Sequence, residues 1–172
     1  MNKALCVFLI LYIMLGNEAI GQQVSTPDIT KTVIAGKSIP LKQISSGGVI
    51  HRFFDTSPMS PSGRYVALFR LPYEQQSPKP GDAGEVILVD LKTGKERVVA
   101  NTRGWETQLG ANVQWGKSDL ELLFNDVDTT AWKAYGVVLN PFTGKKRKLD
   151  GTVFMVSNDG KRAASYNLLS SP

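Results

Sequence analysis

The sequence contains one strand-and-turn pattern twice, and this repetition constrains the fold more than any other feature. The pattern occupies residues 85–99 and again residues 135–149. It consists of an apolar run, an Asp or Asn, a Thr-Gly-Lys turn, and a run of charged and apolar residues. Gly94 and Gly144, which are 50 residues apart, provide the positive φ that such a turn requires. Each copy therefore predicts a β-hairpin.

A second element recurs in phase with the hairpins. A Ser/Asp/Gly turn precedes a β-rich run in residues 60–69, 116–124 and 157–166. Each unit thus reads as four strands in about 40 to 50 residues, which is typical of a propeller blade. No segment after residue 22 shows sustained helical periodicity. We predict an all-β chain, an incomplete β-propeller of about two and a half four-stranded antiparallel blades.

The predicted blades occupy residues 49–172. The first blade lies near residues 49–100 and the second near 108–150, followed by two strands of a third at 152–168. Residues 22–48 form a polar N-terminal leader with one β-like stretch, Thr32 to Ile34. Because propellers close with about four to eight blades, we expect a truncated, N-terminal part of a longer protein. Assembly with other chains is the alternative, since unpaired sheet edges are avoided in nature.

Residues 1–21 have the features of a secretory signal peptide. Lys3 precedes an apolar run at residues 4–15, and small residues follow at Ala19 and Gly21. The run of twelve is short for a membrane span, although a short membrane anchor is the alternative. We therefore predict a secreted or periplasmic protein without a membrane span after cleavage. Cys6, the only cysteine, lies in this run, so the mature chain has no cysteine metal ligand.

The charge balance favours an anionic partner. Twenty Lys and Arg against fifteen Asp and Glu give a net charge of +5, compatible with nucleic acid, an acidic membrane surface or an acidic polysaccharide. The strongest basic run, residues 145–148, has no interleaved aromatic residues and falls at a predicted hairpin edge. This run and the signal peptide argue against nucleic acid. The sequence also lacks serine-hydrolase, phosphate-loop and zinc-protease motifs.

Three strings carry a resemblance to a known family. Residues 51–58 (HRFFDTSP), 63–70 (GRYVALFR) and 110–116 (GANVQWG) together resemble the N-terminal part of the β-propeller polysaccharide lyases. Ulvan lyases are the nearest group and oligogalacturonate lyases a more distant one, with similarity over roughly residues 49–170. The Ser-Pro-x-Gly-Arg turn of residues 60–64 is similar to the TolB-like repeat of periplasmic propellers.

The resemblance implies β-elimination on a uronic-acid-containing, ulvan-like polysaccharide. Such an enzyme neutralises the uronate carboxylate, removes the C5 proton and protonates the departing C4 oxygen. The alternative is a non-catalytic TolB-like periplasmic propeller that binds protein or glycan. The sequence departs from the lyases where histidines are expected, since Asn112 and the region of Trp132 occupy those places. We expect the remaining Tyr and Arg to lie beyond residue 172, so that this chain alone is inactive.

Six residues are candidates for the site. His51, the only histidine, is the candidate for proton transfer, and a structural bond to a neighbouring loop is its alternative. Arg103 and Trp105 suit a carboxylate and a sugar ring, unless Trp105 is wedged between blades. Asn112 and Gln114 alternate with apolar residues and so share one face of an inner strand, where they bind a carboxylate or backbone groups. Arg52, beside His51, completes the predicted substrate-binding set.

The cofactor requirement stays open. The oxygen-rich side chains of Asn125, Asp126 and Asp128 follow Phe124 and are compatible with Ca²⁺, although the EF-hand spacing is absent. A solvated turn is the alternative for this cluster. The long loop of residues 72–84 is either functional or a mobile surface loop.

Overall fold

The computed structural model describes residues 31–34 and 37–165, and its regular elements there are all strands. This confirms the prediction of an all-β chain. Within those ranges no helix is long and apolar enough to cross a membrane. The predicted signal peptide, residues 1–21, lies outside the described residues. The strands are β1 Lys31–Ile34, β2 Lys37–Pro40, β3 Val49–Ile50, β4 Tyr65–Arg70, β5 Gly84–Asp90, β6 Glu96–Thr102, β7 Gln114–Trp115, β8 Leu122–Asp128, β9 Lys133–Leu139, β10 Lys146–Lys148, β11 Met155–Val156 and β12 Ala163–Ala164.

The chain divides into two compact units at residues 42 and 43. The first unit contains an antiparallel hairpin in which β1 pairs with β2, from Lys31 opposite Pro40 to Ile34 opposite Lys37. Strand β1 includes the stretch Thr32 to Ile34 that the sequence predicts as β-like. All other strands belong to the second unit.

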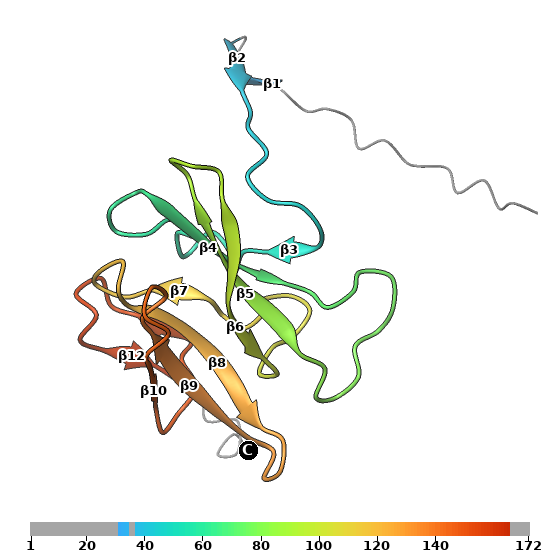
Figure 1. Cartoon of the computed structure of the whole chain (residues 1–172), viewed down its shortest axis with the longest axis vertical. Coiled ribbons are helices and arrows are strands. Elements are labelled where there is room, and N and C mark those ends of the chain that lie inside the picture. The colour runs from blue at the N-terminus through green and yellow to red at the C-terminus, as the bar shows by residue number, and fades with distance from the viewer. Residues whose placement is uncertain (1–30, 35–36, 166–172) are drawn as a thin grey trace, which may run out of the picture. The chain divides into compact units, whose positions relative to one another are not determined.

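The second unit contains two four-stranded antiparallel sheets and a two-stranded sheet (Figure 1). The first sheet has the order β3-β4-β5-β6 and the second β7-β8-β9-β10, so neighbouring strands are consecutive in the sequence. Strands β11 and β12 form the third sheet, an antiparallel hairpin.

The two predicted Thr-Gly-Lys hairpins are present, at β5–β6 and β9–β10. Gly94 and Gly144 have φ values of 71° and 76°, as the turns require. Asp90 accepts a hydrogen bond at 2.9 Å from the amide of Lys92, and Asn140 accepts one at 3.0 Å from the amide of Phe142. The Asp or Asn before each turn therefore holds the turn backbone, because its side chain replaces a missing main-chain acceptor.

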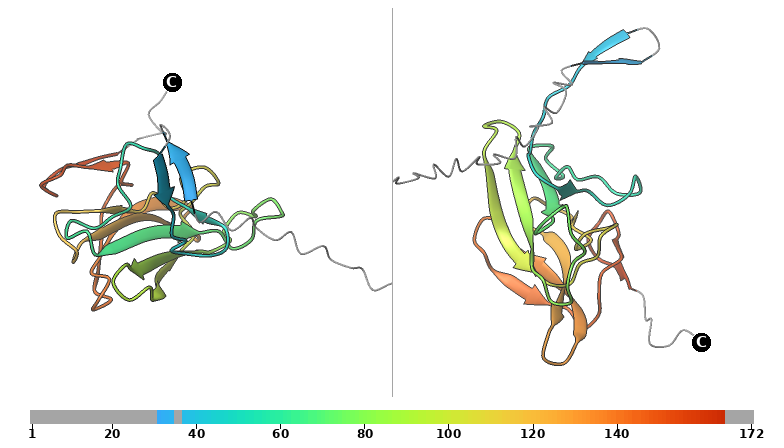
Figure 2. Two further views of the ribbon diagram at one scale, coloured as in Figure 1. Left: turned by 90° about the horizontal axis from the view of Figure 1, so that it is seen from above. Right: turned by 90° about the vertical axis from the view of Figure 1, so that its right-hand side faces the viewer.

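The two larger sheets pack on each other through one apolar core (Figure 2). Buried side chains of the first sheet, among them Phe69 and Leu88, meet Leu122 and Phe124 of the second. Burial of each such side chain stabilises the fold by about 1.5–3 kcal/mol. This core explains why the two sheets form a single unit.

The opposite face of the first sheet is also buried. Val66, Leu68, Ile87 and Val89 form a second apolar cluster, against which Ile44, Val49 and Leu91 pack. Because β4 and β5 are covered on both faces, their sequences read as continuous apolar runs rather than alternating ones.

Two local predictions were wrong. The predicted inner strand at residues 111–114 is reduced to β7, because Asn112 has a φ of 59°, which an extended strand does not adopt. Asn125, Asp126 and Asp128 lie in β8 rather than in a loop. Strand β8 pairs with β9 as far as Asp128 opposite Lys133, so the strand continues well past Phe124.

Phe69 packs so closely against two glycines that no larger residue fits at either position. A Cβ on Gly110 would lie 2.8 Å from Cβ of Phe69, and Gly110 has a φ of +61°. A Cβ on Gly84 would lie 2.1 Å from the phenyl ring. These contacts are closer than carbon atoms allow, so both glycines are required by the packing of Phe69.

We predict that Gly110→Ala lowers the free energy of unfolding by about 2–4 kcal/mol, from the positive φ and the overlap with Phe69 together. Gly94→Ala is the matched control, because Gly94 has a φ of +71° but a Cβ at this position would meet no atom within 4 Å. The control should lose only about 1–2 kcal/mol. Urea unfolding measures both values, and equal losses would show that Phe69 does not constrain Gly110.

Candidate functional site

A groove of about 1410 Å³ lies on the second unit. Its walls come from residues 78–82 before β5, residues 103–112 between β6 and β7, the β8–β9 hairpin, and residues 150–154 before β11. Arg103, Trp105 and Asn112 line it, so the structure brings together three of the six predicted site residues. His51, Arg52 and Gln114 are not among its lining residues.

Trp105 is held in place from two sides. Its indole N–H donates a 2.7 Å hydrogen bond to the carbonyl oxygen of Asp82, and its ring lies 5.3 Å from that of Phe69. The residue is half-buried against the main core. The packing role that the sequence left open is therefore present, and the same ring lines the groove.

Trp132 is a groove residue that the sequence did not single out for binding. It lies at the tip of the β8–β9 hairpin, is 60% exposed, and has a φ of 48°. A Cβ on Gly81 would lie 3.8 Å from its ring, so Trp132 adjoins the opposite wall. A bulky residue with positive φ is uncommon and tends to mark functional sites. A Trp in the connection between two predicted strands was the available signal.

Arg103 lines the groove and carries an unpaired cation. Its backbone amide donates a 3.0 Å hydrogen bond to Asp126, whereas its guanidinium has no partner among the described residues. Lys79 and Lys133 add positive charge to the lining. The lining also contains three acidic residues, Asp82, Glu106 and Asp150, which equal these cations in number. Asp82 accepts a bond at 2.7 Å from the amide of Lys79, and Glu106 accepts one at 2.8 Å from that of Gln108.

Asp126 joins the two large sheets beside the groove. Its carboxylate accepts hydrogen bonds from the Thr102 hydroxyl at 3.0 Å, the Tyr135 hydroxyl at 3.1 Å, and the amides of Arg103 and Val127. Burial alone raises the pKa of Asp126, but these bonds outweigh it and hold the pKa below its usual value. Gly104 packs so closely here that a Cβ would lie 2.4 Å from the Asp126 backbone.

The predicted calcium ligands are already engaged by protein donors. The side-chain oxygen of Asn125 accepts a 2.7 Å bond from the amide of Val153, and Asp128 accepts one at 2.9 Å from the amide of Thr130. Asp126 accepts from two hydroxyl and two amide donors. Across residues 31–34 and 37–165, no three His, Cys, Asp or Glu side chains are grouped as for a metal. The residues present therefore do not fit a Ca²⁺ site.

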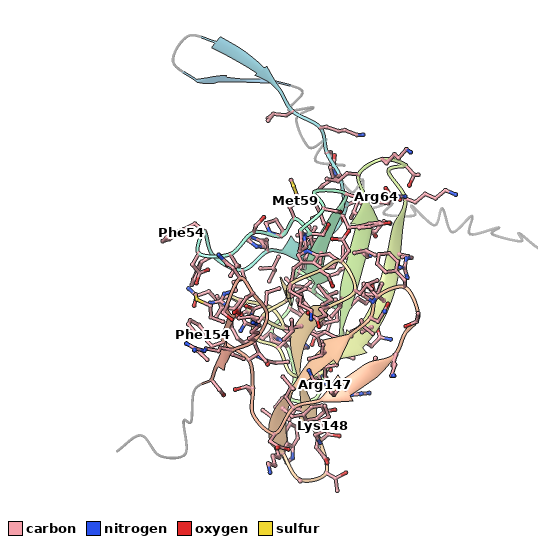
Figure 3. The ribbon with its side chains drawn as sticks, turned by 90° about the vertical axis from the view of Figure 1, so that its left-hand side faces the viewer. Phe54, Met59, Arg64, Arg147, Lys148 and Phe154 are labelled. Atoms are coloured by element: carbon pink, nitrogen blue, oxygen red, sulfur yellow. The ribbon has the colours of Figure 1, made fainter. Side chains whose placement is uncertain are left out.

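Arg52 lies outside the groove and holds the segment before β11. Its side chain is only 1% exposed and pairs with Asp55 at 2.9 Å. It also donates to the carbonyl oxygen of Phe154, and the guanidinium lies 4.3 Å from the centre of the Phe154 ring. Figure 3 shows Phe154 and Phe54 on the same flank in that view. The observed contacts of Arg52 are thus structural.

His51 precedes this arginine and is half-buried, with Nε2 enclosed and without a hydrogen-bond partner. Burial lowers the pKa of His51, the Asp55 carboxylate opposes this, and the Arg52 guanidinium adds to the lowering. The neutral imidazole is therefore the form that the folded chain favours.

We predict that folding stability falls as the pH drops through the usual histidine pKa near 6.5. Below about pH 6.5 the imidazole of the unfolded chain binds a proton, whereas that of the folded chain stays neutral until the pH passes below its lowered pKa. Protonation therefore stabilises the unfolded chain over this pH range. His51→Gln should abolish this part of the pH dependence. Thermal midpoints at about pH 5.5 and 7.5 test it, since most carboxylates stay ionised in that window. An unchanged pH dependence in the variant would contradict the assignment.

Three amide side chains, Asn112, Gln114 and Asn125, form what we call the amide clamp. Asn125 donates to the carbonyl of Val153 at 2.9 Å and accepts from its amide. Asn112 donates to the carbonyls of Val153 and Phe154, the latter at 3.0 Å. Gln114 donates to the Phe154 carbonyl at 3.1 Å and accepts from the amide of Val156 at 3.0 Å.

The contacts of the amide clamp can be compared with the two roles predicted for Asn112 and Gln114, which are binding of a carboxylate and binding of backbone groups. Both side chains bind the same segment, while Ala111 and Val113 enter the main core, so the predicted alternation of faces is present. The bonds go to backbone groups, which is one of the two roles that the sequence left open. Oδ1 of Asn112 is nevertheless buried and without a partner. Binding of a substrate carboxylate by these residues stays a prediction.

Comparison with known proteins adds no relative. The chain matches no protein-family model, no curated protein and no solved structure. The resemblance to β-propeller polysaccharide lyases therefore rests on the three sequence strings alone.

Proposed function

We propose that this chain is part of a secreted, carbohydrate-active β-propeller whose groove binds a uronic-acid-containing, ulvan-like polysaccharide. The observation that carries the proposal is the combination of two tryptophans and an unpaired arginine in one groove. Trp105 and Trp132 line it from different elements, and the guanidinium of Arg103 has no partner among the described residues.

The chemistry of these side chains suits an acidic sugar. An indole offers a flat, rigid apolar face on which the C–H face of a pyranose ring can lie, at little cost in conformational entropy. An arginine binds a carboxylate through two parallel hydrogen bonds. Lys79 and Lys133 supply further positive charge to the lining. The groove thus offers contacts for both the rings and the charges of such a polymer.

The arrangement of the sheets supports the propeller part of the proposal. Two four-stranded antiparallel sheets have the same strand order and pack face to face. The third sheet follows in the chain, and its first strand, β11, contacts β7, the first strand of the second sheet. Adjacent first strands are what a radial arrangement around an axis requires.

The lyase activity is the further part of the proposal. The described residues that line the groove include no histidine or tyrosine, and His51 lies elsewhere. The groove supports polysaccharide binding more directly than it supports proton transfer. A non-catalytic TolB-like propeller that binds glycan uses the same groove, so the two alternatives differ only in turnover.

We predict that Trp132→Ala and Arg103→Gln each weaken binding of ulvan or polygalacturonate by about tenfold. Matched controls are Phe54→Ala, which removes an aromatic ring that is fully exposed, and Arg147→Gln on β10. Neither control residue lines the groove. Isothermal titration calorimetry measures the affinities, with dextran as a neutral glycan. Equal losses in variants and controls would contradict binding in the groove.

We predict that the full-length protein, rather than this chain alone, releases unsaturated uronate products from ulvan, because elimination creates a C4–C5 double bond. The ultraviolet absorbance of that double bond measures the reaction, with polygalacturonate as a second substrate. Binding without any rise in absorbance on either polymer would contradict the lyase and leave the glycan-binding alternative.

A further inference from the structure

The residues on either side of the third sheet form a wall of the groove. Residues 150–154 and Ser165 line the groove on that side, and they frame the β11–β12 hairpin. The remaining walls belong to the first two sheets and their connections. The segments that join this hairpin to the rest of the unit therefore bound the groove on one side.

Little apolar surface attaches this wall to the rest of the unit. Within residues 150–165 only Val153 is fully buried, and both residues of β12 are exposed. The core between the two large sheets, by contrast, contains eleven buried residues. Few buried apolar contacts mark the segments of a protein that open at low free energy.

Polar contacts to the backbone make up most of the attachment. The amide clamp and Arg52 bind the amide and carbonyl of Val153, the carbonyl of Phe154 and the amide of Val156. The Phe154 carbonyl alone accepts from three side chains, those of Arg52, Asn112 and Gln114. The neutral hydrogen bonds contribute about 0.5–1.5 kcal/mol each and the bond from the charged Arg52 about 1.5–3 kcal/mol, because water replaces them when they break.

In the observed structure, four buried polar atoms near this wall have no partner among the described residues. They are Oδ1 of Asn112, Nε of Arg52, Nε2 of His51 and Oγ1 of Thr56, all on the clamp or on the segment that contains Arg52. A buried polar atom without a partner disfavours the state that buries it. If the wall opened, the side chains of the amide clamp would be exposed to water, which could then bond to their unpaired atoms. This gain reduces the free-energy cost of opening.

The segment just before the β11–β12 hairpin is attached to β9 and can serve as a fixed point if the hairpin moves. The amide of Leu149 donates to the carbonyl of Gly136 in β9, and the amide of Gly136 donates to the carbonyl of Gly151, each at 2.8 Å. A Cβ on Gly136 would lie 3.0 Å from the carbonyl oxygen of Gly151 and 3.2 Å from the Leu149 side chain, so β9 and this link are closely packed. The link can remain on the second sheet while the residues after it move.

We propose that residues 152–165 are a hinged wall of the groove, which opens by release of the amide clamp and which a bound acidic polysaccharide holds closed. Opening follows from the small apolar contact and the water-replaceable bonds that attach this wall. Closure by the ligand rests on the proposed function, because a polymer in the groove touches this wall and the opposite one. A ligand that contacts both walls binds the closed position more tightly than the open one. The ratio of the two affinities sets how far the ligand shifts the equilibrium towards the closed position.

Hydrogen exchange of the free protein tests the opening. Peptides from residues 152–165 should exchange together and at least about 100-fold faster than those of β4 and β5. Gln114→Met should accelerate exchange there further and leave β4 and β5 unchanged. This variant keeps the side-chain volume but removes the bonds to Phe154 and Val156, and Gln114 does not line the groove.

Asn140→Ala is the matched control for this variant. Asn140 also holds backbone amides with its side chain, but at the β9–β10 turn and away from the groove. It should change exchange only near that turn. Equal protection of residues 152–165 and of β4 in the wild-type chain would overturn the hinge, and this result does not depend on how well any variant folds.

Addition of ulvan or polygalacturonate tests the closure. Exchange at residues 152–165 should slow by at least about fivefold, and Gln114→Met should bind a few-fold more weakly. Binding of the polymer with no change in exchange at these residues would overturn the coupling. Absence of binding by the wild-type chain would instead contradict the proposed function, while the measurement on the free protein still decides the hinge.

Discussion

The packing of the first sheet on the second is the constraint on which the rest of the structure depends. Phe69 is at its centre: its phenyl ring and Cβ exclude any side chain at Gly84 and Gly110, and Trp105 packs against the ring. The connection from β6 to β7 must therefore pass close to the first sheet. That path presents Arg103 and Trp105 to the groove, so the apolar core positions the side chains that we propose bind glycan.

The polar contacts divide into two groups with different consequences. At Asp126 an ionised carboxylate receives four protein donors and connects β6 to β8, which makes the junction of the large sheets rigid. At the amide clamp neutral side chains hold backbone groups and leave Oδ1 of Asn112 without a partner. Charge-assisted hydrogen bonds are about twice as strong as neutral ones. The groove thus lies beside a charged junction of the large sheets and has a wall held mainly by neutral hydrogen bonds.

The predicted catalytic residue and the groove are separate in this structure. His51 and Arg52 belong to the segment after β3, where Arg52 pairs with Asp55 and binds the Phe154 carbonyl. The aromatic and cationic groups suited to a sugar polymer lie on the other connections. Glycan binding and catalytic turnover would therefore depend on different side chains. The affinity measures binding, and the release of products measures turnover.

Local patterns in the sequence determined the strands and turns, because they depend on neighbouring residues. The Asp90 and Asn140 turns, the glycines with positive φ and the all-β character follow from residues a few positions apart. Trp132 and the amide clamp could not be predicted in this way, because their partners are far away in the sequence. Asn112 binds residues 153 and 154 only because packing of the sheets brings them together, and Asp126 continues a strand only because β9 pairs with it. The sequence alone thus determined the units of this fold, whereas tertiary contacts decided which side chains meet at the groove.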